Sequence, residues 1–198
     1  MKLNKLFILC AVAVLVLGAG SLRADIIPVA NPSFELDSPN WTSSVIGWDG
    51  QAYAVMANSW GGQFQRNQDG QNFLFASGYG IPMSQTLTNA VSGTEYKLTV
   101  AVSCAWFTDQ ATDERIQLQA GGVTFAEYYE PNQANVNFQD VVLQGTAPND
   151  GALKIVLVSG SDRRAAFDNV RLESVPEPMT LALLAVGGLV SLKRRNRA

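Results

Sequence analysis

Two acidic residues near opposite ends of the 198-residue chain, Glu35 and Asp168, lie beside apolar or aromatic residues, where a charge is unusual. Strand alternation around Asp168 puts its side chain on the same face as Val170 and Leu172, which we expect to be the core face. A carboxylate in a core is costly unless a basic side chain, several N–H donors or a metal ion compensates its charge. Glu35 directly follows an aromatic residue, Phe34, and raises the same question.

Catalysis has little support in the residue types. The chain contains no histidine, which excludes a Ser-His-Asp triad, a Cys-His pair and a His-bearing zinc site. A glycosidase needs only two carboxylates at a set separation. The acids that could supply them cluster around polar turns, which favours a solvated rim: Asp109, Asp113, Glu114, Glu127 and Glu130. We therefore expect a protein that is not an enzyme.

Aromatic residues in loops are candidates for sugar binding, because a planar ring offers an apolar surface to one face of a sugar. We predict that Trp41, Trp60 and Tyr79 contact a ligand, the two tryptophans most of all because they lie in polar loops. Tryptophan is highly buried on average, so a core position is the alternative. Three further aromatic residues are weaker candidates: Trp48, Tyr128 and Tyr129.

The segments that position these residues have the pattern of short strands. From Asp25 onward, alternating runs are separated by Gly, Asn, Asp and Pro, which predicts an all-β domain. The clearest strand, Glu95 to Trp106, puts Cys104 on its apolar face, where a buried inert thiol is favoured over a reactive one. Gly121 and Gly122, between two further strands, predict a two-residue hairpin turn.

The number and character of the strands predict how they pack. Leu153 to Ser159 is apolar on both faces, so we expect a central strand, preceded by a turn at 148–151. About nine or ten short strands, with turns at intervals of about ten residues, favour a two-sheet sandwich of jelly-roll type. A β-barrel is the structural alternative.

Two short motifs lie near the ends of the predicted domain: Asn31-Pro32-Ser33-Phe34-Glu35 near the start and Phe167-Asp168-Asn169-Val170-Arg171-Leu172 near the end. They resemble the ends of carbohydrate-binding-module-like jelly rolls, the galactose-binding-like β-sandwiches. The resemblance implies that the first and last strands lie close together. It also implies that Glu35 and Asp168 share a structural Ca²⁺ ion, with backbone carbonyls and Asn31 or Asp49 completing six to eight oxygen ligands. The alternative is that both acids cap turns or accept backbone N–H groups without a metal.

The N-terminus has the features of a secretory signal peptide, predicted to cover residues 1–24. Lys2 and Lys5 precede an apolar run from Leu6 to Leu17, and small residues follow it. The remaining body, residues 25–174, has seven basic and 16 acidic residues, a net charge of −9. An acidic body argues against binding of nucleic acid, whose phosphates need a basic patch. Cys104 is the one cysteine of this body, so no intramolecular disulfide is expected.

The C-terminal segment, residues 175–198, contains Pro176, Glu177 and Pro178, followed by the 14 uncharged residues Met179 to Leu192 and a basic end. This order resembles the PEP-CTERM sorting signal of exported bacterial proteins, whose sorting motif corresponds to the Pro-Glu-Pro triplet. As a helix, the apolar run would be roughly 21 Å long, short of the ~30 Å hydrocarbon core. The resemblance implies recognition and cleavage by a membrane-embedded exosortase, transient anchoring of the hydrophobic helix in the inner membrane, and export together with exopolysaccharide.

Together these features predict an exported protein of the cell envelope or extracellular matrix with three parts: signal peptide, β-sandwich and sorting tail. We expect the sandwich to be non-catalytic and to bind extracellular polysaccharide. The alternative is a structural or adhesive matrix component without a specific ligand, and a glycan-active hydrolase is less favoured.

Overall fold

The computed structural model describes eight stretches of the chain, residues 24–39, 44–50, 54–57, 69–76, 82–104, 112–133, 137–159 and 165–175. The side chains of 54–57, 104, 112–113 and 130–133 are outside this description. So are residues 1–23 and 176–198, which hold nearly all of the predicted signal peptide and the sorting motif. Within the described ranges, no helix is long and apolar enough to span a membrane. Residues Asp25–Val175 form one compact unit.

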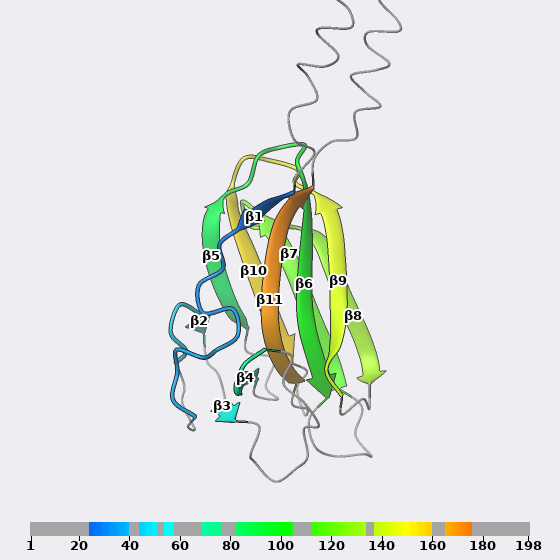
Figure 1. Cartoon of the computed structure of the whole chain (residues 1–198). Coiled ribbons are helices and arrows are strands. Elements are labelled where there is room, and N and C mark those ends of the chain that lie inside the picture. The colour runs from blue at the N-terminus through cyan, green and yellow to red at the C-terminus, as the bar shows by residue number, and fades with distance from the viewer. Residues whose placement is uncertain are drawn as a thin grey trace, which may run out of the picture. The chain divides into compact units, whose positions relative to one another are not determined.

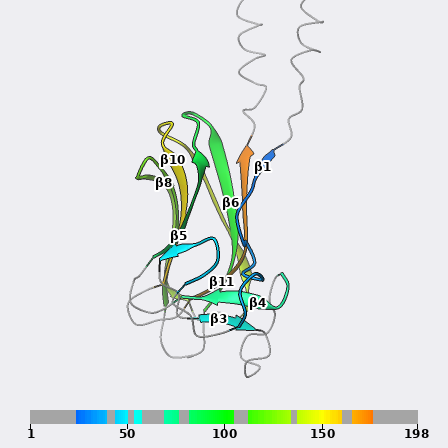
Figure 2. The same ribbon diagram turned by 90° about the vertical axis from the view of Figure 1, so that its left-hand side faces the viewer.

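The described elements are strands arranged in two antiparallel sheets (Figures 1 and 2). The six-stranded sheet has the order β3 (Ala54–Ala57), β4 (Asn72–Phe75), β11 (Ala165–Val175), β6 (Glu95–Cys104), β9 (Gln139–Thr146), with β1 (Asp25–Ile27) also on β11. The five-stranded sheet has the order β2 (Asp49–Gly50), β5 (Met83–Asn89), β10 (Ala152–Ser159), β7 (Thr112–Ala120), β8 (Val123–Gln133). The predicted all-β, two-sheet jelly-roll sandwich is confirmed.

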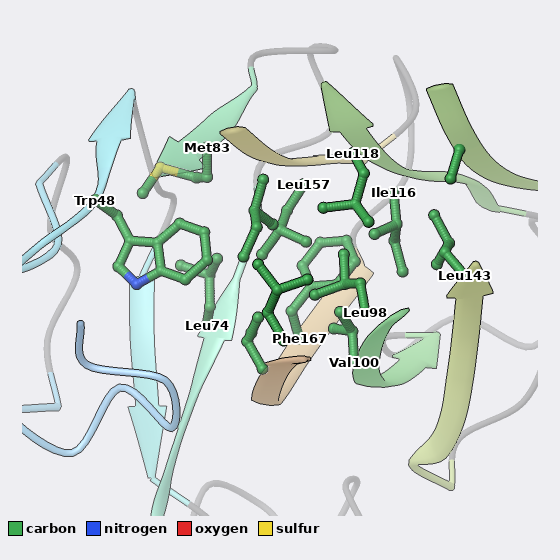
Figure 3. Packing of buried hydrophobic residues seen from close by; sticks show 14 of the residues in the cluster. Trp48, Leu74, Met83, Leu98, Val100, Ile116, Leu118, Leu143, Leu157 and Phe167 are labelled. Carbon is green, nitrogen blue, oxygen red and sulfur yellow. The ribbon is translucent and has the colours of Figure 1, made fainter. Parts of the chain in front are cut away.

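The core lies between the sheets and is built largely from alternate residues of the longer strands (Figure 3). In β10, Leu153, Ile155 and Leu157 are fully buried, and in β6 Leu98 and Val100 are fully buried opposite them. Burying one such side chain contributes roughly 1.5–3 kcal/mol. β10 lies between β5 and β7, so the prediction of a central strand is confirmed.

Two predicted turns are present. Gly121 and Gly122 join β7 to β8 with φ angles of 56° and 81°, as a tight hairpin requires. The turn between β9 and β10 is held by the Asn149 side chain, whose Oδ1 accepts a hydrogen bond from Gly151 N at 2.9 Å. Both turns were therefore predicted correctly from the local sequence.

The first and last strands of the unit are neighbours, as the resemblance implied. Ile27 lies opposite Leu172 and Asp25 opposite Ser174 in an antiparallel pair. Figure 1 shows β1, in blue, beside β11, in orange. β4 pairs with the other half of β11, at Ala166 and Phe167. β11 thus connects the N-terminal segment to the middle of the chain.

Candidate functional site

A β-bulge in β11 decides which way Asp168 points. Asp168 pairs with Ala101 and Arg171 with Thr99, so β11 has one residue more than β6 between these pairs. Asn169 takes a left-handed conformation there, with φ 49°. Because an extra residue reverses the alternation, Asp168 faces away from the main core, on the side of Ala101. The prediction that it shares a face with Val170 and Leu172 is therefore wrong.

Asp168 is nonetheless completely buried, on the outward side of the six-stranded sheet. Its Oδ2 accepts a hydrogen bond from Asp69 N at 3.1 Å, and its Oδ1 accepts one from Asn169 N at 2.7 Å. Phe75 and Ala166, directly opposite each other on neighbouring strands, are also fully buried. Backbone N–H donors thus supply part of the compensation that a buried carboxylate needs.

Glu35 is exposed, and the same short segment of chain binds it. Its Oε1 accepts hydrogen bonds from Gln71 N at 2.6 Å and Asn72 N at 2.5 Å. Gly70 lies between Asp69 and Gln71 and has φ 72°. A Cβ atom placed on Gly70 would collide with the Glu35 carboxylate. Segment 69–72 therefore connects the two acids that the sequence singled out, one by Asp69 N and the other by Gln71 N and Asn72 N.

Asn31 and Asp49, predicted to complete an ion site, have other surroundings. The Asn31 amide donates to Asp37 Oδ2 at 2.7 Å and to the Ile46 carbonyl at 3.1 Å, and its Oδ1 accepts from Leu36 N at 3.1 Å. The Asn31 side chain thus organises the loop that follows β1. Asp49 is exposed on β2 of the other sheet.

The fit to a metal ion depends on oxygen ligands. Glu35, Asp69 and Asp168 offer carboxylate oxygens, which suit Ca²⁺. Ser33 Oγ donates to Asp69 Oδ2 at 2.7 Å, which brings the opening segment to the same place. In the part of the chain that the structure describes, no group of three acidic, cysteine or histidine side chains could hold a metal ion. An ion here would depend on carbonyl oxygens as well, and calcium stays a prediction.

The outward face of the five-stranded sheet carries a second group of polar side chains. Strand pairing places Asp49, Ser84, Val156, Gln117 and Glu127 in one row across the five strands. The flanking rows are Val158, Arg115, Tyr129 and Thr86, Lys154, Gln119, Thr124. Residues directly opposite in paired strands share a face. Ten of these twelve residues are polar, charged or tyrosine and two are valines, and Ser84 and Val156 are buried. We call the twelve residues the polar face.

Side chains on the polar face are connected to one another. Arg115 Nε lies 3.1 Å from Glu127 Oε1, which also accepts a hydrogen bond from Gln117 Nε2 at 3.0 Å. Gln119 Nε2 donates to Gln117 Oε1 at 3.0 Å. The Arg115 guanidinium lies 5.1 Å from the ring centre of Tyr129, which is 48% exposed. Exposed pairs of this kind add little stability, so their main effect is to orient the side chains.

The described aromatic candidates differ from one another in burial. Trp41, Trp60 and Tyr79 lie outside the described residues. Trp48 is buried beside Phe34, with ring centres 5.7 Å apart, and its Nε1 donates to the Asn31 carbonyl at 3.3 Å. Tyr129 is exposed on the polar face. The sequence signal for this face is the alternation of Arg115, Gln117 and Gln119 with Ile116 and Leu118, which is typical of a strand with one polar side.

The acidic residues expected on a solvated rim differ in their burial. Glu127 is exposed on the polar face, whereas Glu114 is only 2% exposed. Glu114 alternates with Arg115 in β7 and so lies on the inward side with Ile116, which is a correction to the expected rim. The side chains of Asp109, Asp113 and Glu130 lie outside the description.

The fold is shared with solved carbohydrate-binding modules. TmCBM61, solved with β-1,4-galactotriose, has a TM-score of 0.52 and 14% identity, over 74% of this chain and 97% of the other. The CBM22-1 xylan-binding domain of Paenibacillus barcinonensis Xyn10C has a TM-score of 0.50 and 16% identity, over 80% and 100%. The enzymatically active domain of tailspike protein 4 of bacteriophage CBA120 gives 0.51 and 16%, over 76% of this chain but 22% of its own. At these identities the likeness defines the fold alone.

The sequence itself matches a narrower group. The sequence model of the HpiC1-like family, described as HpiC1 cyclase, matches residues 25–173, and the chain belongs to this family. Among curated proteins, none matches the chain.

Proposed function

We propose that the polar face binds an extracellular polysaccharide and that the domain is non-catalytic. The observation that carries this proposal is the exposed Tyr129 ring, braced by Arg115 beside the connected side chains of Glu127, Gln117 and Gln119. An aromatic surface next to amide and carboxylate groups matches a sugar, which has apolar C–H faces and hydroxyl edges. The galactotriose complex and the xylan-binding domain of similar fold support a glycan as the ligand.

Paired substitutions test this proposal. In Tyr129→Ala and Gln117→Ala we expect at least about tenfold weaker binding, or 1.4 kcal/mol, to whichever of β-1,4-galactan and xylan the full-length protein binds in titration calorimetry. Gln144→Ala is the matched control, because Gln144 is exposed on β9 of the other sheet. Equal losses in Gln117→Ala and Gln144→Ala would contradict a role for the face.

A glycan array decides between binding and a purely structural role. We expect signals from a subset of plant or bacterial glycans that disappear in Tyr129→Ala. A flat array would overturn the binding proposal in favour of a structural or adhesive matrix component. The array also includes Trp41→Ala and Trp60→Ala, the loop positions predicted from sequence.

We further propose export and sorting through residues 175–198. The support is the Pro176-Glu177-Pro178 motif, the apolar run and the basic end. An exosortase-type enzyme would remove the tail and release the sandwich to the envelope or matrix. Mass spectrometry of protein extracted from the cell surface should then show a chain that ends near residues 175–179. Recovery of an intact Lys193–Ala198 end would count against processing.

A structural Ca²⁺ ion is part of the same proposal. Its support is that segment 69–72 donates backbone hydrogen bonds to both Glu35 and Asp168, and that Asp69 in this segment accepts a hydrogen bond from Ser33. An ion there would link the loop after β1 to β11 and would act on stability, not on ligand contact.

A second candidate comes from the family description, which names a cyclase. Asp168 and Glu114 are the buried acids among the described residues, and Asp168 is the one that we would test for such a reaction. A cyclisation activity of the full-length protein that is lost in Asp168→Asn but kept in Tyr129→Ala would replace the binding proposal. No such activity together with a positive glycan array would retain it.

A further inference from the structure

An open pocket of about 460 Å³ lies at the edge of the five-stranded sheet, beside β5. β2 pairs with β5 only at Met83 and Ser84 among the described residues. Beyond them, the segment 28–30 lies along β5 and forms the opposite wall of the pocket, with Gly47 at its end. The volume is within the range of about 300–1,000 Å³ that is typical of small-ligand sites.

The walls of the pocket are held together by Gln85. Its Oε1 accepts a hydrogen bond from Ala30 N at 2.7 Å, and its Nε2 donates to the carbonyls of Ala30 at 2.9 Å and Gly47 at 2.8 Å. Gln85 is 5% exposed, and both amide hydrogens are used. The pocket is therefore preformed, and its amide group serves the protein and not a ligand.

The remaining lining residues are mostly apolar. Ile27, Pro28, Val29 and Leu87 form an apolar wall, and none of the lining residues that the structure describes is charged. The hydroxyl side chains in the lining are those of Thr86 and Thr88. A charged group would lose hydration here without a partner, which is unfavourable. The lining thus selects a neutral group with an apolar part and few hydrogen-bonding positions.

The pocket is continuous with the polar face through Thr86. Thr86 lines the pocket and also begins the row that continues through Lys154 and Gln119 to Thr124. A β-bulge in β5 lies directly after Thr86. Between the pairs Thr86–Lys154 and Asn89–Ala152, β5 advances by three residues and β10 by two. Bulges are frequent beside functional sites, where they redirect side chains. A ligand that crosses the sheet along this row reaches the pocket at its end.

From this arrangement we propose that the pocket binds an O-acetyl substituent of a neutral sugar, on a polysaccharide that lies across the polar face. The inference rests on the proposed polysaccharide binding and extends it to a substrate class. The acetyl methyl group would pack on the apolar wall, and the threonine hydroxyls would reach the ester oxygens.

The test compares two small probes, methyl 3-O-acetyl-β-xylopyranoside and methyl β-xylopyranoside, in NMR titrations of the full-length protein. We expect the acetylated probe to bind about fourfold tighter, the effect of burying one methyl group. In saturation-transfer spectra its acetyl methyl should receive the strongest signal. Equal affinities for the two probes, or a saturation signal spread uniformly over the whole sugar ring, would overturn the proposal.

Variants locate the effect. Thr88→Phe should remove one of the two lining hydroxyl groups and crowd the pocket from its exposed rim, so the two probes should bind equally. Thr146→Phe is the matched control, since Thr146 is exposed on β9 of the other sheet, and it should keep the preference. Thr86→Phe is the second pocket variant if circular dichroism shows that Thr88→Phe is unfolded. A preference that survives a folded pocket variant would contradict the proposal.

Failure of this inference is distinguishable from failure of the proposed function. Tyr129→Ala should weaken polysaccharide binding but leave the preference for the acetylated probe unchanged. An acetyl preference without any polysaccharide binding would remove the proposed function and leave the pocket assignment. Polysaccharide binding without an acetyl preference would remove the pocket assignment and leave the proposed function.

Discussion

Two polar regions of this sandwich use similar residues in opposite ways. Around segment 69–72, carboxylates bind backbone N–H groups of distant parts of the chain, and Asp168 is completely buried. On the polar face, Arg115, Glu127 and Gln117 bind mainly one another at the surface. The first arrangement connects segments that would otherwise separate. The second only orients side chains, and it leaves them accessible to a ligand.

The energies of the two regions should differ accordingly. A buried donor left without its acceptor costs about 1–3 kcal/mol, whereas an exposed ion pair contributes about 0–1 kcal/mol. We therefore expect substitutions around segment 69–72 to change stability, and substitutions on the polar face to change binding.

The largest expected effect is that of Asp168→Ala. It removes the acceptor of Asp69 N and Asn169 N in a buried position, so we expect a loss of about 3 kcal/mol or more in the free energy of unfolding by urea. Asp140→Ala is the control in the same sheet, since Asp140 forms an exposed ion pair with Arg171 at 2.6 Å. It should cost no more than about 1 kcal/mol. Similar losses in the two variants would erase the distinction between the regions.

Calcium provides the next test. If the ion is bound only by the folded state, Ca²⁺ at a hundred times its Kd stabilises the protein by about 2.7 kcal/mol. The melting temperature should fall on addition of a chelator and recover with excess Ca²⁺, and Asp168→Asn should remove this response. An unchanged melting temperature would show that the protein compensates these acids without a metal ion.

Glycine substitutions measure how tightly segment 69–72 closes on Glu35. Gly70→Ala should cost about 2 kcal/mol, because φ is 72° and the added Cβ collides with the Glu35 carboxylate. Gly93→Ala, with φ 83° and no neighbour within 4 Å, should show the backbone cost alone, about 1 kcal/mol. The difference between them should disappear in the background Glu35→Ala. If it persists there, the contact with Glu35 is not its cause.

The smallest expected change in stability is on the polar face. Arg115→Ala removes the contact to Tyr129 and the ion pair to Glu127, yet should alter the free energy of unfolding by no more than about 1 kcal/mol. The same variant should weaken polysaccharide binding about tenfold in calorimetry. A large loss of stability without a loss of binding would reverse the roles assigned to the two regions.

Prediction from sequence worked where local rules apply. The alternation in Glu95–Cys104, the glycine pair at the hairpin and the apolar run of β10 each identified an element and its place. Prediction failed at Asp168, because a bulge adds one residue to β11 and reverses the alternation of a regular strand. It also missed the polar face, whose residues come from five strands and meet only through pairing.

By itself, the sequence determined the all-β class, the turns, the acidic body and the absence of histidine chemistry, since each depends on residue type and short-range pattern. Tertiary structure alone decided which groups meet. Asp69 reaches Asp168 across 99 positions and Gln85 reaches Ala30 across 55. Such contacts follow from strand order and register, which are set by the packing of the whole core and not by the neighbours of any one residue.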